Sequence, residues 1–237
     1  FRALKSIKNQ TIAANEVYII DTHPTGKNRL NINKAKNFLK LNIIYLGSLK
    51  NKNALIARNY ASNLSRSKYL AFLDDDDFWE KNYMQNVLLN IKKNKSKLNI
   101  SEYKVVNLNR KKLFYFHIPE KIKIQELFRW NPGILCSNIV IDRTTFKKLN
   151  GFDTNILGSA DKDILIKCIK KNIKYSVMKK GLVNWTLHEN QWSQNNELIL
   201  EGVKKFNKKY FSEMNLFSKM ISLKKIINLN IKKIFFK

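Results

Sequence analysis

One stretch of the chain, Tyr69 to Trp79, restricts the possible folds more than any other. Its first five residues, Tyr69-Leu70-Ala71-Phe72-Leu73, predict a strand buried on both faces, as in a sheet that helices cover from both sides. Four aspartates, Asp74 to Asp77, follow without a spacer. Adjacent carboxylates repel one another, and cations or water must offset that repulsion. The stretch therefore predicts a buried strand that ends in carboxylates suited to a hard divalent cation such as Mg²⁺ or Mn²⁺.

The acidic stretch also has a plainer interpretation, which is a solvated turn that caps the next helix. The chain has 18 acidic residues against 45 basic ones, so four adjacent aspartates concentrate a scarce charge. An EF-hand loop is excluded, because no Asp-x-Asp-x-Asp-Gly pattern with a closing Glu is present. We therefore favour a functional acidic site and keep the solvated turn as the alternative.

The charge of the chain predicts polyanionic partners. The formal net charge is +27 at pH 7 over 237 residues, of which 44% are hydrophobic, a composition that suits one large α/β core. Such a charge attracts nucleic acid, anionic lipid or phosphate-bearing substrates. We expect no specific nucleic-acid partner, because the sequence has no zinc-finger spacing and no RNA-binding aromatic motif. Cys136 and Cys168 lie apart in apolar contexts, which predicts buried free thiols in a reducing compartment.

Strand-like and helix-like segments alternate along the chain. The expected strands cover residues 16–21, 42–46, 69–73, 134–141, 174–178 and 182–187, with a hairpin over 102–116. The expected helices cover residues 1–10, the later part of 22–40, 51–65, 80–93, 122–130, 143–149 and 161–172. This alternation predicts an α/β fold with a mostly parallel central sheet and flanking helices.

The last part of the chain differs in kind from the rest. From Val203 to Lys237 it carries ten lysines and one acidic residue, Glu213, interleaved with apolar residues. This pattern predicts a basic amphipathic helical tail that lies on an anionic membrane surface. The alternative is a terminal helix packed on the body with its lysines in water. The membrane interpretation implies a cytoplasmic protein, peripheral on the inner face of the cell membrane.

Six segments in a fixed order provide a more specific signal. They are Arg2 to Thr11, Glu16 to Asp21, Ala57-Arg58-Asn59, Leu73 to Trp79, Ser137 to Ile141 with Gly151-Phe152-Asp153, and Ala160-Asp161-Lys162-Asp163. The fifth looks like an acceptor-side strand with a "GGFD"-like turn, and the sixth like an "EDxD" motif. Together they resemble glycosyltransferase family 2 over roughly residues 1–193. No single motif decides the resemblance, but their shared order makes coincidence improbable.

The resemblance implies a GT-A fold, which is a Rossmann-like nucleotide-diphospho-sugar transferase fold. It divides residues 1–200 into a nucleotide-sugar half, 1–98, and an acceptor half, 99–200, followed by the basic tail, 201–237. Members of the family normally begin with a strand that lines the nucleotide-base pocket, and nothing precedes Phe1 here. We therefore expect the sheet to lack this inner strand. Ala160 also departs from the pattern, because the family usually has an acid there.

The resemblance also implies roles for individual residues. Asp161 would be the catalytic base. The donor would be bound by Asp21, Arg58, Asp74 and Asp75. The metal, Mg²⁺ or Mn²⁺, would be bound by Asp76 and His188. On the acceptor side, Trp79 and Trp192 would offer apolar platforms for sugar rings. For Asp161 the plain alternative is a carboxylate that only favours the start of a helix.

These roles agree with the chemistry of sugar transfer. The leaving group is a nucleoside diphosphate, whose growing charge a bound cation would stabilise, while a carboxylate on the other side would accept the proton of the acceptor hydroxyl. We expect an inverting, metal-dependent glycosyltransferase that uses a UDP-sugar and a lipid-linked or cell-surface glycan acceptor. The alternatives are a nucleotidyltransferase of similar fold and a non-catalytic basic module that binds membrane or nucleic acid.

Overall fold

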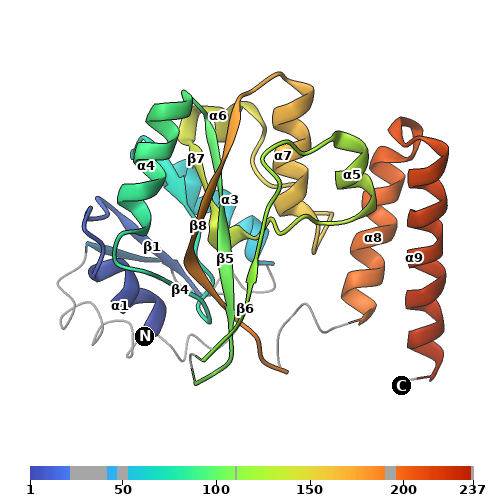
Figure 1. Cartoon of the computed structure of the whole chain (residues 1–237), viewed down its shortest axis with the longest axis horizontal. Coiled ribbons are helices and arrows are strands. Elements are labelled where there is room, and N and C mark those ends of the chain that lie inside the picture. Colours follow the sequence, from blue (N-terminus) through green and yellow to red (C-terminus); the bar gives the residue numbers. More distant parts are fainter. Residues whose placement is uncertain (22–41, 47–52, 110, 190–195, 236–237) are drawn as a thin grey trace.

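The computed structural model describes residues 1–21, 42–46, 53–109, 111–189 and 196–235. Within these residues the chain forms two sheets with helices on both sides, and a pair of helices stands at one end (Figure 1). The smaller sheet pairs β1 (Val17–Ile20) with β2 (Ile43–Leu46) in parallel. The mixed α/β architecture of the prediction is confirmed.

The larger sheet has six strands. Five follow the order β3-β7-β5-β8-β4, and β6 pairs with β5 beside that path. Their bounds are β3 Tyr69–Ala71, β4 Phe78–Trp79, β5 Leu98–Val106, β6 Lys112–Phe116, β7 Ile139–Asp142 and β8 Tyr175–Thr186. Only the β5–β8 pairing is parallel among the described pairings of this sheet, so the expectation of a mostly parallel sheet is wrong for it. Helices connect only some of its strands, and parallel pairing depends on such crossovers.

The larger sheet separates two apolar cores. Strand β5 is buried along nearly all of its length and lies near the centre of the sheet. One core joins its face to helix α4 (Tyr83–Asn94) through Tyr83, Val87 and Ile91. The other core gathers side chains from several helices: α3 (Ala54–Leu64), α5 (Ile124–Arg129), α6 (Arg143–Lys148), α7 (Ala160–Lys170) and α8 (Asn196–Tyr210). Burial on both faces explains the continuous apolar runs of the inner strands.

Local signals set several helix ends. Asn53 caps α3, because its side chain accepts hydrogen bonds from Leu55 N and Ile56 N. Asp142 caps α6 in the same way through Thr145 N. The chain then leaves α6 through Asn150 and Gly151, both with positive φ. A Cβ at Gly151 would lie 2.5 Å from the Asn59 side-chain oxygen, so this turn packs tightly against α3.

Several elements differ from the expected ones. The strand expected over residues 134–141 is limited to β7, because a 3-10 turn at Cys136–Asn138 occupies its first part. The two late strands are one strand, β8, which continues through Lys179-Lys180-Gly181 because its pairing with β5 shifts register there instead of ending. The short strand β4 directly after the acidic stretch was not expected. Helix α1 (Arg2–Lys8) and the hairpin of β5 and β6 agree with the prediction. Both cysteines are buried and free, as expected.

A large cavity lies between the two sheets. Its volume is about 1880 Å³, and its lining includes the consecutive residues 17–21 of β1 and 67–76 around β3. No described strand pairs with β1 on one side and β3 on the other. The acidic stretch opens into the same cavity.

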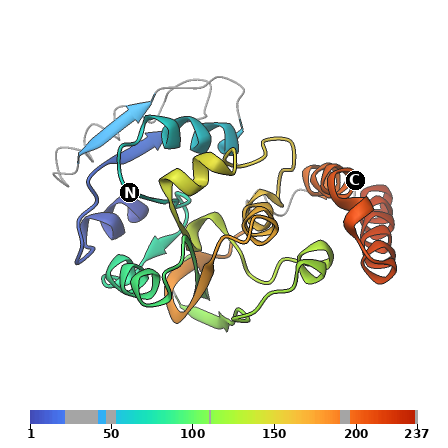
Figure 2. The same cartoon turned by 90° about the horizontal axis from the view of Figure 1, so that it is seen from above.

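The C-terminal helices pack on the body and on each other. Helix α8 begins at Asn196, before the expected boundary at residue 201, and Phe206, Tyr210 and the following Met214 belong to the larger core. Helix α9 (Leu216–Phe235) runs beside α8 (Figure 2). The packed alternative therefore describes α8 and the side of α9 that contacts α8 and α5. Among the described residues, no helix is long and apolar enough to cross a membrane.

Candidate active site

The four aspartates form a turn between β3 and β4. The turn closes through a hydrogen bond from Asp77 N to Asp74 O, 3.2 Å. Asp74, Asp76 and Asp77 each offer a carboxylate oxygen, and these three oxygens lie within 4.8 Å of one another. Asp75 is exposed. Only Leu70 of the three β3 residues is buried, so the predicted burial of this strand on both faces is wrong, because the strand borders the cavity. It leads directly into the turn, whose Asp74, Asp75 and Asp76 line that cavity.

Asp77 is the buried member of the group. It is 1% exposed, and its Oδ1 accepts a hydrogen bond of 2.9 Å from Thr186 N, at the end of β8. Its Oδ2 has no hydrogen-bond partner in the described part of the chain. Burial, followed by the charge of Asp74, raises the pKa of Asp77 to about 8. Sequence reasoning did not single out Asp77 from its neighbours, because alternation along the turn does not reveal which carboxylate points inward.

The donor set of this turn fits a hard divalent cation. Three carboxylates supply oxygen ligands, which Mg²⁺ and Mn²⁺ prefer. A buried oxygen without a partner costs free energy, and a cation beside it would remove that cost. The same cation would favour the ionised form of Asp77 over the protonated one.

Distant residues hold the turn in shape. Ser137 Oγ accepts from Asp74 N at 3.1 Å, and Ser137 O accepts from the indole N–H of Trp79 at 2.8 Å. Arg2 of α1 donates to the carbonyl oxygen of Asp76 and, at 3.0 Å, to Thr186 Oγ1. Neither Ser137 nor Arg2 was predicted as a site residue. Their only sequence signal was membership in the resembling segments.

Arg58 and Asp21 lie at the same cavity. Arg58, on α3, forms an ion pair with Asp74. Asp21, at the end of β1, is buried and accepts a hydrogen bond of 3.3 Å from Tyr45 OH. Both residues line the cavity with Asp74, Asp75 and Asp76. The structure thus brings together all four predicted donor-binding residues.

His188 contacts the acidic turn through a single residue. Its Nε2 lies 2.9 Å from Asp76 Oδ2, and it too lines the cavity. The group of three mutually close ligands consists of Asp74, Asp76 and Asp77, without His188. The geometry therefore places His188 beside Asp76, the other residue expected to bind the metal.

Asp161 occupies the first turn of α7. Its Oδ1 accepts a hydrogen bond of 2.8 Å from Lys162 N, and burial raises its pKa to about 6. The charge of Asp161 interacts with Arg58, the ion-pair partner of Asp74, and, against the effect of burial, raises the pKa of that guanidinium group. Burial, and then the charges of Asp161 and Asp77, raise the pKa of Tyr103 on β5. Asp161 is thus within electrostatic range of the groups at the acidic turn. It is not among the residues that line the cavity itself.

The two expected sugar platforms have different outcomes. Trp79 borders the cavity, but it is 7% exposed, and its ring packs against Tyr83 at 4.8 Å between centroids. Its indole N–H is already bonded to Ser137 O. Its contacts are therefore those of a core residue that supports the turn. Trp192 lies outside the described residues.

Comparisons with known proteins agree with this geometry. The model of glycosyl transferase family 2 matches residues 2–149, and the chain belongs to this family. One relative, the UDP-Glc:alpha-D-GlcNAc-diphosphoundecaprenol beta-1,3-glucosyltransferase WfgD of Escherichia coli, is 29% identical over 170 residues, which are 72% of this chain and 64% of the relative. The putative teichuronic acid biosynthesis glycosyltransferase TuaG of Bacillus subtilis is 26% identical over 66% of this chain and 60% of its own length.

The solved structures support the GT-A fold. The crystal structure of S. aureus TarS 1-349 in complex with UDP-GlcNAc matches with a TM-score of 0.69 at 17% identity, over 99% of this chain and 71% of that one. The chain spans somewhat less than two thirds of the length of the two relatives named above. These comparisons establish the family and the fold.

Proposed function

We propose that this protein is an inverting glycosyltransferase that moves a sugar from a UDP-sugar to a hydroxyl group of a lipid-linked or cell-surface glycan, with Mg²⁺ or Mn²⁺ as cofactor. The observation that carries the proposal is the meeting of Asp74 and Asp76 with Asp21 and Arg58 at one cavity, with the buried Asp77 carboxylate beside the first two. The name of the relative WfgD, which pairs a UDP-sugar with a diphosphoundecaprenol acceptor, supports both substrate classes.

The residues of this chain divide the reaction between them. Asp21 and Arg58 bind the nucleotide part of the donor, and the acidic turn orients its diphosphate. Asp161 accepts the proton of the acceptor hydroxyl as that oxygen bonds to the anomeric carbon and the bond to the diphosphate breaks on the opposite face. A pKa of about 6 suits this role, because Asp161 is ionised at neutral pH but is still a stronger base than an ordinary carboxylate. The cation, when bound, supplies positive charge to the departing diphosphate.

The test begins with donor binding. A thermal-shift comparison of UDP-, GDP- and dTDP-sugars, with and without Mn²⁺, should show stabilisation by one UDP-sugar that depends on Mn²⁺. Asp76→Asn should abolish this stabilisation and retain the unliganded melting temperature. A nucleotidyltransferase would instead form a nucleotide-sugar from a nucleoside triphosphate and a sugar phosphate. The names of the relatives do not favour that alternative.

We extend the proposal to the membrane. Along α9, Leu216, Met220, Leu223 and Ile227 recur at helical spacing and are each more than 45% exposed. Lys224 and Lys225 are exposed beside this row. An exposed apolar row flanked by lysines suits the surface of an anionic membrane, with the apolar side chains among the acyl chains and the ammonium groups at the phosphates. This would hold the enzyme at the inner face of the cell membrane, where a lipid-linked acceptor is reached.

Vesicle flotation tests this extension. The protein should float with phosphatidylglycerol vesicles and not with phosphatidylcholine vesicles, and Leu223→Glu with Ile227→Glu should abolish flotation. Lys81→Glu, at the other end of the molecule, serves as a control for total charge. If the double variant floats like the parent, or if it changes only the oligomeric state, the row faces something other than lipid.

A further inference from the structure

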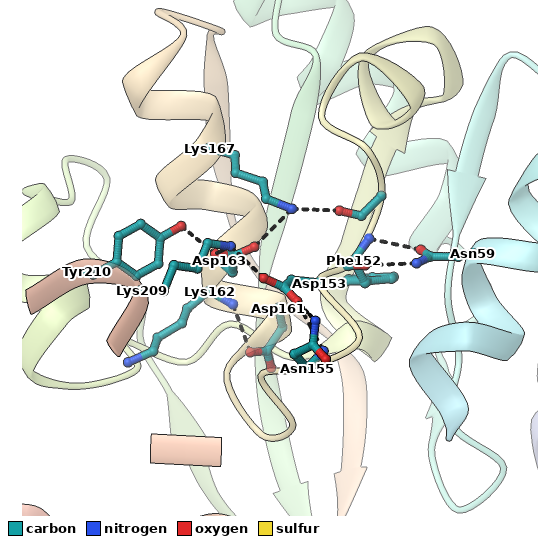
Figure 3. A network of polar contacts seen from close by, with 11 residues as sticks. Asn59, Phe152, Asp153, Asn155, Asp161, Lys162, Asp163, Lys167, Lys209 and Tyr210 are labelled. Carbon is teal, nitrogen blue, oxygen red and sulfur yellow. Dashed lines mark hydrogen bonds and ion pairs between the residues drawn. The ribbon is translucent and has the colours of Figure 1, made fainter. Parts of the chain in front are cut away.

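The first turn of α7 carries three consecutive charged residues, Asp161, Lys162 and Asp163. Their side chains lie on different sides of the helix and contact different parts of the protein. A helix turns by about 100° per residue, so Asp161 and Asp163 point to nearly opposite sides. Asp161 interacts electrostatically with Arg58, whereas Asp163 points to α8 (Figure 3). A movement that displaces one of these carboxylates must therefore displace the other.

Asp163 is fixed by cations and a hydroxyl group. It is fully buried, and its Oδ1 accepts hydrogen bonds from Tyr210 OH and, at 2.7 Å, from Lys209 Nζ. Lys167 Nζ lies 3.0 Å from the other oxygen, Oδ2. Tyr210 and Lys209 come from the end of α8, which is 46 residues away along the chain from Asp163. Charge-assisted bonds of this kind define an orientation as well as a distance.

Lys209 extends the contact to a second loop. Its Nζ also lies 2.9 Å from Asp153 Oδ2. The neighbouring Phe152 exchanges two backbone hydrogen bonds, of 2.8 Å and 2.9 Å, with the Asn59 side chain of α3. Asn59 follows Arg58 directly. Burial opposes the charge of Lys209, but the hydrogen bonds to Asp163 and Asp153 outweigh burial and raise its pKa. A continuous set of contacts thus links the helix of Arg58 to the helix of Asp161 through α8.

Close packing of α8 against α7 and the loop before it also supports this set of contacts. A Cβ at Gly202 of α8 would lie 1.9 Å from the carbonyl oxygen of Leu157, in the loop before α7, so only glycine permits this approach. The ammonium group of Lys162 donates to Leu127 O at 2.9 Å and lies 3.9 Å from the centroid of the Phe206 ring. Helix α8 therefore contacts the loop before Asp161, the residue after it and the buried carboxylate beyond it.

From this arrangement we infer that α8 positions the candidate base: Lys209 and Tyr210 hold the first turn of α7 through Asp163, and thereby set the distance of Asp161 from the acceptor hydroxyl. The inference rests on the proposed function and deepens it. It makes the end of α8 part of the machinery for transfer, although it touches no substrate. Lys209 and Tyr210 are positioning residues, and the basic C-terminal segment is required for turnover as well as for location.

The decisive experiment compares Tyr210→Phe and Lys209→Met in the full chain with two controls. Lys208→Met removes the neighbouring exposed lysine from the same helix, and Lys209→Arg retains the charge. We expect the two positioning variants to lower kcat about tenfold to a hundredfold, as expected for a small displacement of a reacting group, with an unchanged KM for the donor. Lys208→Met should match the parent, and Lys209→Arg should recover most of the turnover.

A second measurement does not depend on turnover. Hydrogen exchange of the peptide covering residues 154–166 should accelerate in both positioning variants, while the peptide covering the acidic turn should keep its exchange rate. Unchanged exchange of residues 154–166, or a lowered melting temperature with unchanged kcat, would overturn the inference. If the parent protein binds UDP-sugar but transfers no sugar to any acceptor, the proposed function itself fails, and faster exchange in the variants would then describe a structural contact only.

Discussion

Two groups of aspartates in this molecule have opposite environments. In the acidic turn, oxygens of Asp74, Asp76 and Asp77 lie close together. Arg58 forms an ion pair with one of the three, Asp74. Around α7, Asp153 and Asp163 are matched by Lys167, Lys209 and the hydroxyl group of Tyr210 (Figure 3). Both groups contain a buried carboxylate. Only the first leaves a buried carboxylate oxygen, Oδ2 of Asp77, with neither a hydrogen bond of normal geometry nor an ion pair in the described chain.

This difference is the one expected between a site that binds a cation and a structural site. Carboxylates that repel one another in a buried turn are unstable as anions, and the raised pKa of Asp77 reflects this instability. A bound cation would therefore stabilise the ionised form of such a group. A buried carboxylate with several donors is already satisfied and gains nothing from a ligand. Asp161 lies between these cases, since it is close to the matched group in sequence but has a raised pKa.

The largest expected effect concerns this intermediate residue. Asp161→Asn should lower kcat by about 10²- to 10⁴-fold, because the amide cannot accept the proton of the acceptor hydroxyl. Donor binding with Mn²⁺ should be retained, since the acidic turn is intact. Radiolabel transfer and thermal shift measure the two properties separately. Normal turnover in this variant would assign Asp161 to the structural group.

A second pair of substitutions tests the comparison directly. Asp163→Asn should lower the free energy of unfolding by about 3 kcal/mol, because it leaves Lys167 and Lys209 without their buried partner. Asp77→Asn, at a comparably buried position, should leave that free energy unchanged or raise it at pH 7, because Asp77 is largely protonated there. Urea unfolding of both variants provides the measurement. Equal losses would show that the two environments do not differ in the way described.

The third prediction concerns pH. The pKa of Asp161 is raised to about 6, so the base is ionised above this pH and protonated below it. Turnover should therefore be constant above pH 7 and fall about tenfold for each unit below pH 6. Lys162→Met should move this acid limb to higher pH, since the charge of Lys162 favours the ionised form of Asp161. A pH profile of kcat for the two proteins would show the shift, and an unchanged limb would remove Asp161 as its source.

The smallest expected effect lies at the support of the acidic turn. Ser137→Ala removes the oxygen that accepts from Asp74 N and should lower the free energy of unfolding by about 1 kcal/mol. It should also weaken the Mn²⁺-dependent stabilisation by UDP-sugar, because the turn becomes less ordered. Ser218→Ala, at an equally buried serine of α9, is the matched control for stability. If both variants weaken donor binding alike, the effect does not arise at the turn.

The sequence predicted the local features of the site well. A short apolar run followed by four aspartates identifies both the strand and the acidic turn, because the pattern and the chemistry lie within eleven residues. The helices around Arg58 and Asp161 were also expected from their apolar spacing. The order of motifs related these segments to the family, which physical patterns alone did not do.

The sequence patterns did not predict contacts between residues that lie far apart along the chain. Arg2 reaches Asp76 across 74 residues, Ser137 reaches Asp74 across 63, and Tyr210 reaches Asp163 across 47. Nothing in the local pattern distinguishes Ser137 or Tyr210 from other buried polar residues. Strand directions were misjudged for a related reason, since pairing partners depend on the path of the chain between them. The lysine-rich end was read as a separate tail because its composition, unlike its packing, differs from that of the body.

The bond between Trp79 and Ser137 gives the protein an internal optical reporter. Ser137 links the two groups, because its carbonyl oxygen accepts from the indole N–H and its hydroxyl oxygen accepts from Asp74 N. The indole ring is largely buried and borders the cavity. A change of charge at the turn alters the electric field across this ring, and tryptophan emission responds to that field. In a variant that keeps Trp79 and replaces the other three tryptophans, emission should therefore follow occupation of the turn in real time and without an acceptor.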